Sequence, residues 1–182
     1  MIGDSHVKDI GSELQARTDS TTKCCALSTP GATSKIITDN LNLHTTHLTP
    51  VDYLIYMSGT NDMQKCEGKV IVNPAEEEKN NVLSHAKHTN VIMVTIPHRK
   101  DDKEFNQYID VYNNHLKQCI DKYKETSKYG DRITLLDVNL ILENWHYTRF
   151  GLHLNKFGKE ALAQRIVQIK NQIEEKVGKE SF

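Results

Sequence analysis

The chain has 182 residues and carries 23 Lys and Arg against 24 Asp and Glu, a formal net charge of −1. This length predicts a single domain over residues 1–182 with a core of its own. A hydrophobic fraction of 37% excludes a disordered chain. A charge near zero makes nucleic acid an unfavoured partner, although a local basic patch is compatible with it. No run of about 18 apolar residues is present, so we expect no membrane span.

The amino-terminal segment and the cysteines bear on the compartment. The first residues contain neither a basic region nor an apolar core, so we expect no signal peptide and an intracellular protein. The cysteines are Cys24, Cys25, Cys66 and Cys119, and no pair has Cys-x-x-Cys spacing. A zinc site is therefore not indicated, and we expect four reduced thiols.

Strand and helix patterns alternate along the chain. A very short or truncated strand at Met1 and Ile2 precedes a helical pattern at 7–14. The later predicted strands are 23–28, 51–57, 90–96 and 132–138, and the later predicted helices are 36–41, 74–88, 105–125 and 155–176. Strands that alternate with helices in this way form parallel sheets. We therefore predict an α/β fold with a parallel sheet of about five strands, covered on both faces.

Polar or small residues follow each predicted strand. Parallel strands bring their carboxyl ends to one edge of the sheet, where open α/β sheets build their sites. We therefore expect these segments to converge there. They are Gly3-Asp4-Ser5-His6, Pro30-Gly31-Ala32-Thr33, Gly59-Thr60-Asn61-Asp62, Pro97-His98-Arg99 and Gly151-Leu152-His153-Leu154-Asn155.

These residue types suit nucleophilic acyl transfer. A serine hydroxyl such as that of Ser5 is a weak nucleophile and needs a positioned base, for which His153 is the best-placed imidazole. The oxyanion would need hydrogen-bond donors. The backbone N–H groups of Ser5 and Gly31 and the side-chain amide of Asn61 are the candidates. Alternatively, Ser5 only caps a helix and Gly31 only forms a turn.

The segments Gly3-Asp4-Ser5, Gly31, Gly59-x-Asn61-Asp62 and His153 together resemble the four blocks of the SGNH (GDSL-type) hydrolases. The resemblance covers nearly the whole chain, in the family's order. It implies Ser5 as nucleophile, Gly31 and Asn61 in the oxyanion hole, and His153 as base. It also implies a three-layer α/β/α, flavodoxin-like fold and esterase, lipase or acetyl-hydrolase activity with no cofactor. Several segments are also similar in sequence to the esterase-type domains of animal transposon-derived proteins.

One residue departs from the family pattern. The family usually places an aspartate three residues before the histidine, and this position is Phe150. Phenylalanine cannot orient an imidazole or stabilise an imidazolium. Three interpretations are open: a Ser–His dyad oriented by a backbone carbonyl, a carboxylate from elsewhere such as Glu143 or Asp62, or an inactive site on a fold kept for binding.

Other residues have simpler interpretations. His6 is a rival base, but we expect its ring to point along the helix after Ser5. Arg99 is either a solvated loop residue or a contact for an anionic group. We expect Trp145 and Tyr147 to cover the core, and Asn155 to cap the last helix.

Two functions follow from these observations. The first is a serine esterase whose partner is a small-molecule or lipid ester. The second is a catalytically weak or inactive module that binds nucleic acid or protein. The loops at 63–74 and 98–104 would select a substrate, but their residues do not indicate which one.

Overall fold

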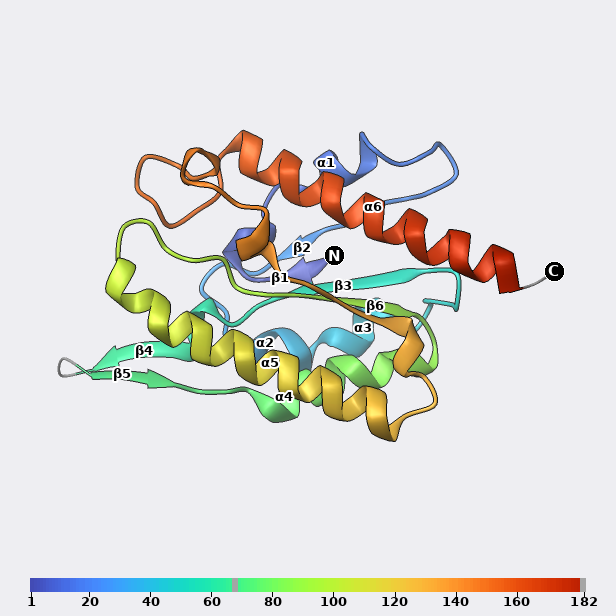
Figure 1. Cartoon of the computed structure of the whole chain (residues 1–182), viewed down its shortest axis with the longest axis horizontal. Coiled ribbons are helices and arrows are strands. Elements are labelled where there is room, and N and C mark those ends of the chain that lie inside the picture. The colour runs from blue at the N-terminus through green and yellow to red at the C-terminus, as the bar shows by residue number, and fades with distance from the viewer. Residues whose placement is uncertain (67–68, 181–182) are drawn as a thin grey trace.

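The computed structural model describes residues 1–66 and 69–180. At its centre is a five-stranded parallel sheet (Figure 1). In spatial order its strands are β2 (Leu27–Ser28), β1 (Ile2–Gly3), β3 (Tyr53–Met57), β6 (Asn90–Val94) and β7 (Ile133–Leu136). Counted along the chain, the parallel strands have the order 2-1-3-4-5 of flavodoxin-like folds. The predicted fold class is confirmed, and β1 is as short as expected.

Helices cover both faces of this sheet, as Figure 1 shows. Helices α1 (Ile10–Gln15) and α6 (Lys156–Glu180) lie on one face. The other face is covered by α2 (Ser34–Asp39), α3 (Leu41–Thr45), α4 (Glu76–Ser84) and α5 (Asn106–Thr126). None of the helices within the described ranges is both long and apolar enough to cross a membrane.

The alternation of side chains along β3 explains the two layers. Ile55 and Met57 belong to the core on the α6 side, whereas Leu54 and Tyr56 belong to the core on the α5 side. Successive residues of a strand point to opposite faces, so a strand covered on both faces is apolar throughout. Burial of each such side chain contributes about 2 kcal/mol, which fixes the register of the central strand.

Several elements differ from the sequence predictions. The predicted strand 23–28 is reduced to Leu27–Ser28 because only these residues pair with β1. The helix predicted at 7–14 is a 3-10 turn at Ser5–Val7 followed by α1. Asp9 separates the two with a left-handed φ of 65°. The helix predicted at 36–41 is divided into α2 and α3. The remaining predicted strands and helices are present with shifted ends.

A β-hairpin replaces part of the loop predicted at 63–74. Its strands are β4 (Met63–Cys66) and β5 (Lys69–Val72), which pair antiparallel with each other and form a separate two-stranded sheet. Residues 67 and 68 of that predicted loop lie outside the described residues.

Candidate active site

The strand order places two of the predicted site segments at the centre of the sheet edge. Strands β1 and β3 are neighbours, and the chain leaves them toward opposite sides of the sheet. In open α/β sheets, ligands bind in the crevice outside the carboxyl ends of such a pair. Ser5 follows the end of β1 by two residues, and Gly59 follows the end of β3 by two residues.

The turn that carries Ser5 is fixed by its neighbours. Asp4 caps the 3-10 turn, accepting a hydrogen bond from the His6 backbone N–H at 3.0 Å. A Cβ at Gly3 would lie 2.0 Å from the Met57 carbonyl oxygen, so only glycine allows this approach of β1 to β3. Ser5 itself is half-buried. Because Asp4 is the capping residue, the simpler interpretation of Ser5 as a helix cap is wrong.

The candidate oxyanion donors come from segments that are hydrogen-bonded to one another. The Asn61 side-chain amide donates to the Ala32 carbonyl at 3.0 Å, next to Gly31, whose φ is +75°. The Ser28 hydroxyl donates to the Asp4 carbonyl at 2.9 Å. Among the hydrogen bonds between described residues, none is donated by the backbone N–H of Ser5 or of Gly31. Both N–H groups, and the second N–H of Asn61, can therefore be offered to an oxyanion.

Beneath Asn61 lies a buried polar network. The Asp62 carboxylate accepts hydrogen bonds from the Ser34 backbone N–H at 3.1 Å and from the Ser34 hydroxyl at 2.6 Å. Burial raises the pKa of Asp62, although the hydrogen bonds from Ser34 act in the opposite direction. The Tyr112 hydroxyl lies 3.2 Å from the Ser34 hydroxyl. The Lys79 ammonium lies 3.6 Å from the centroid of the Tyr112 ring. Burial lowers the pKa of Lys79 to about 8.

His153 lies on a loop at the same sheet edge. A bridge between Tyr147 and Leu154 closes this loop, and Thr148 donates its backbone N–H to the His153 carbonyl at 2.8 Å. Asn155 then caps α6, as predicted, by accepting from the Gly158 N–H at 3.0 Å. The His153 side chain is exposed, and its ring centroid lies 5.3 Å from that of His6, the residue after Ser5.

The surroundings of His153 favour the neutral form of its ring by lowering its pKa. Partial burial is the largest cause that lowers the pKa of His153, followed by the positive charge of His6. The negative charges of Asp4 and Asp101 act in the opposite direction. A neutral imidazole can accept a proton, which is the form that a general base requires.

This chain lacks the acid of the family pattern, and neither Glu143 nor Asp62 is hydrogen-bonded to His153 in its place. Phe150 is 68% exposed, and the Arg149 guanidinium lies 4.7 Å from its ring centroid. The Glu143 carboxylate accepts from the Trp145 indole N–H at 3.0 Å, and Asp62 is bonded to Ser34. Within the described part of the chain, no hydrogen bond joins the His153 ring to a carboxylate or to Ser5. Catalytic hydrogen bonds often tighten only when substrate is bound.

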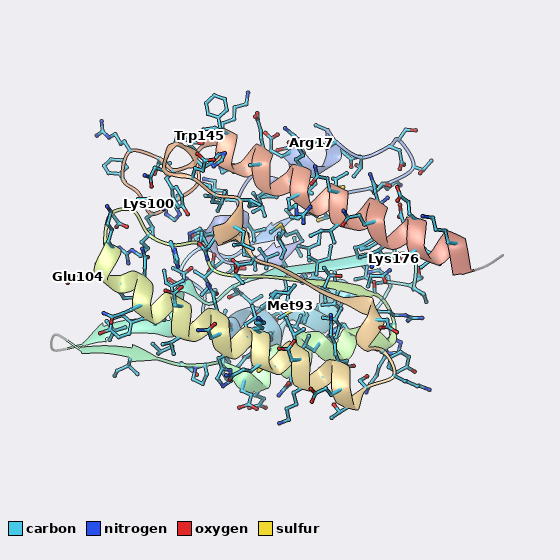
Figure 2. All side chains as sticks on the ribbon, viewed as in Figure 1. Arg17, Met93, Lys100, Glu104, Trp145 and Lys176 are labelled. Carbon is cyan, nitrogen blue, oxygen red and sulfur yellow. The ribbon has the colours of Figure 1, made fainter. Side chains whose placement is uncertain are left out.

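Four neighbouring residues can be compared with the sequence predictions. His6 does not point along a helix. It is buried and bonded on both ring nitrogens. Trp145 does not cover the core, since it is 57% exposed, and Figure 2 shows it at the margin of the molecule near the start of α6. Tyr147 is buried as expected. Arg99 pairs with Asp101 at 2.7 Å and is not free in solvent.

Side chains of the metal-ligating types do not cluster in the part of the chain that the structure describes. No three His, Cys, Asp or Glu residues among them gather into a group that could hold a metal ion. Cys24, Cys25 and Cys119 are free thiols. The side chain of Cys66, for which a reduced thiol was also expected, lies outside the described ones.

Known structures share this fold. A family 3 carbohydrate esterase of Clostridium thermocellum aligns over 94% of this chain and 96% of its own, with 16% identity and a TM-score of 0.67. A GDSL-like lipase of Bacteroides thetaiotaomicron aligns over 94% of this chain and 86% of its own, with 15% identity and a TM-score of 0.66. An acetyl xylan esterase variant of Geobacillus stearothermophilus aligns over 93% of this chain and 92% of its own, with 17% identity and a TM-score of 0.65.

Sequence comparisons add no relative. No family model and no curated protein matches the chain. The structural likeness is therefore a likeness of fold, and the fold is that of the SGNH (GDSL-type) hydrolases.

Proposed function

We propose that this protein is a serine hydrolase that cleaves a carboxylic ester through an acyl-enzyme, with Ser5 as nucleophile and His153 as base. The observation that carries the proposal is the convergence of four segments at one sheet edge. The turn of Ser5 is hydrogen-bonded to the segment that leads to Gly31, and Asn61 is bonded to the residue after Gly31. The ring of His153 adjoins the residue after Ser5.

The reaction would use these groups in sequence. The Ser5 hydroxyl oxygen attacks the ester carbonyl carbon while His153 accepts the hydroxyl proton. The oxyanion is stabilised by the N–H groups of Ser5 and Gly31 and by the Asn61 amide. His153 returns its proton to the departing alcohol, which leaves Ser5 acylated. Water then attacks the acyl carbon, His153 again takes a proton, and the carboxylic acid is released as the Ser5 hydroxyl is restored.

Hydrolysis of p-nitrophenyl acetate tests this function. We expect Ser5→Ala and His153→Ala each to lower kcat by at least about 1,000-fold. Ser20→Ala and His47→Ala are matched controls because both residues are exposed and outside the site, and they should retain the parent's activity. A Ser5→Ala protein as active as the parent would reject the proposal.

The second candidate is an inactive member of the same fold that binds a macromolecule. The observation that favours it is the lack of a carboxylate hydrogen-bonded to His153 among the described residues. A parent protein that is folded but hydrolyses no ester would support this second candidate. Its nucleic-acid version is disfavoured by the net charge of −1, and a gel-shift titration at low and physiological salt would test it.

A further inference from the structure

We propose that His6 is a positioning residue for the base. It would hold the loop of His153, and with it the backbone of the base, through a hydrogen bond to the Leu152 carbonyl. This inference rests on the proposed function and adds to it a residue that neither the acyl transfer nor the SGNH resemblance uses.

The two ring nitrogens of His6 join two separate parts of the site. Nδ1 lies 3.0 Å from the Asp4 carboxylate, with the Thr60 hydroxyl at 3.4 Å from the same nitrogen. Nε2 lies 3.2 Å from the Leu152 carbonyl oxygen, 146 residues away in the sequence. Asp4 is 1% exposed and His6 is 5% exposed, so water does not compete strongly for these bonds.

The placement of these residues ties the nucleophile to the base. Asp4 and His6 flank Ser5, and Leu152 directly precedes His153. Among the hydrogen bonds between described residues, this is the one that connects the turn of Ser5 with the loop of His153. Other bonds of that loop are internal or run to Lys100, whose N–H donates to the Gly151 carbonyl at 2.8 Å. Without the hydrogen bond to Leu152, the bonds of the loop of His153 between described residues would be those within the loop and the one from Lys100. None of them would reach the turn of Ser5.

Both ring nitrogens of His6 face groups that can only accept hydrogen bonds. A neutral imidazole carries one N–H, whereas both nitrogens of His6 face oxygen acceptors, so only the protonated ring donates both bonds. The Asp4 carboxylate beside Nδ1 is itself buried. Burial alone would raise the pKa of Asp4, but the hydrogen bond from His6 and the electrostatic effect of its ring outweigh burial and lower the pKa. A hydrogen bond to a carboxylate is stronger than one between neutral groups.

Two substitutions separate the bonds of His6. In His6→Gln the side-chain NH2 occupies the place of Nε2 and can still donate to the Leu152 carbonyl. In His6→Asn the NH2 occupies the place of Nδ1, so the bond to Asp4 is kept and the bond to Leu152 is lost. His47→Asn, at an exposed histidine, controls for the chemical change.

Kinetics with p-nitrophenyl acetate give the first measurement. We expect His6→Asn to lower kcat about 100-fold, because a misplacement of about 1 Å has effects of that size. KM should change less than about threefold, since the substrate would still bind. His6→Gln should stay within about fivefold of the parent kcat. Equal losses in the two variants, or no loss in His6→Asn, would overturn the proposal.

Amide hydrogen exchange gives a measurement that does not require activity. The N–H of Thr148 is donated to the His153 carbonyl, so its exchange rate reports the order of the loop. We expect about tenfold faster exchange at Thr148 in His6→Asn and the parent's rate in His6→Gln. If the folded parent has no esterase activity, the proposed function fails. The exchange rates then decide the positioning role alone, and equal rates in both variants would overturn it.

Discussion

On the side of Gly31 and Asn61, the candidate active site rests on buried side chains, whereas His153 lies on an exposed loop. Below Asn61, the carboxylate of Asp62 is bonded to Ser34, and Tyr112 and Lys79 continue the contacts into the layer of α4 and α5. The loop of His153 meets the turn of Ser5 through one hydrogen bond between described residues, from His6 to Leu152.

This difference has a consequence for mutation. Groups held by several buried bonds keep their positions when one bond is lost, but the protein loses stability. A group held by one bond can move without unfolding the protein. Substitutions beneath Asn61 should therefore change stability, and substitutions around His153 should change turnover.

After the loss of Ser5 or His153 itself, the largest expected effect is on turnover, at Asn61. Asn61→Ala should lower kcat by about 100–1,000-fold because it removes one oxyanion donor. Asn40→Ala is the matched control, since Asn40 also donates its side-chain amide to a backbone carbonyl but is exposed and outside the site. Ester hydrolysis by the two variants is the measurement. A change in kcat of less than about tenfold for Asn61→Ala would remove this side chain from the oxyanion hole.

The next effect is on stability, at Asp62. Asp62→Ala should lower the free energy of unfolding by about 2 kcal/mol or more, because the buried N–H of Ser34 loses its acceptor. Asp39→Ala removes an exposed carboxylate paired with Lys35 and should lower it by less than about 1 kcal/mol. Urea unfolding of both variants provides the comparison. Equal losses in the two variants would mean that the Asp62 network does not anchor this side of the site.

A smaller effect is expected at Phe150, where a carboxylate would supply the missing acid. Phe150→Asp should raise kcat by about tenfold, which corresponds to about 1.4 kcal/mol of transition-state stabilisation. Phe157→Asp is the control, since Phe157 is 58% exposed and lies in the first turn of α6, and it should leave kcat unchanged. No gain in a folded Phe150→Asp protein would indicate that the His153 ring is already oriented or lies out of reach.

The Phe150→Asp substitution can also be combined with His6→Asn. If His6 and an acid at position 150 perform one task, the loss caused by His6→Asn should be smaller in the Phe150→Asp background. Additive effects on kcat would show that the two residues act independently.

The smallest effect concerns pH. The rate requires neutral His153, and protonation abolishes the base. Because its pKa is lowered from 6.5, chiefly by burial, His153 stays neutral to a lower pH than a free histidine. When kcat/KM of the parent is measured against pH, its fall on the acid side should therefore have its midpoint below pH 6.5. A midpoint at or above 6.5 would contradict the environment described for this ring.

Much of the fold could be predicted from the sequence, because short apolar strands alternate with amphipathic helices. The polar segments after the strands also indicated the edge at which the site would form. The hairpin β4–β5 was missed because its strands pair only with each other and belong to no larger sheet. The division of the helix after Ser5 depends on the left-handed conformation of Asp9, which has no clear sequence signal.

The role of His6 could not be predicted for a different reason. Its position after Ser5 suggested a ring pointing along a helix, but the 3-10 turn ends at Val7 and the ring enters the interior. The partner that decides its orientation is a backbone carbonyl 146 residues away. Any residue type has such a carbonyl, so the sequence contains no pattern for this contact. Trp145 shows the reverse case, since an apolar side chain expected in the core remains exposed.

The most direct test of a Ser5–His153 hydrolase is covalent labelling with a fluorophosphonate, followed by peptide mass mapping of the modified residue. Such probes react with serines that a neighbouring base activates. We expect a single adduct on Ser5 in the parent and none in His153→Ala. A folded parent that carries no adduct, or carries it on another serine, would contradict the account.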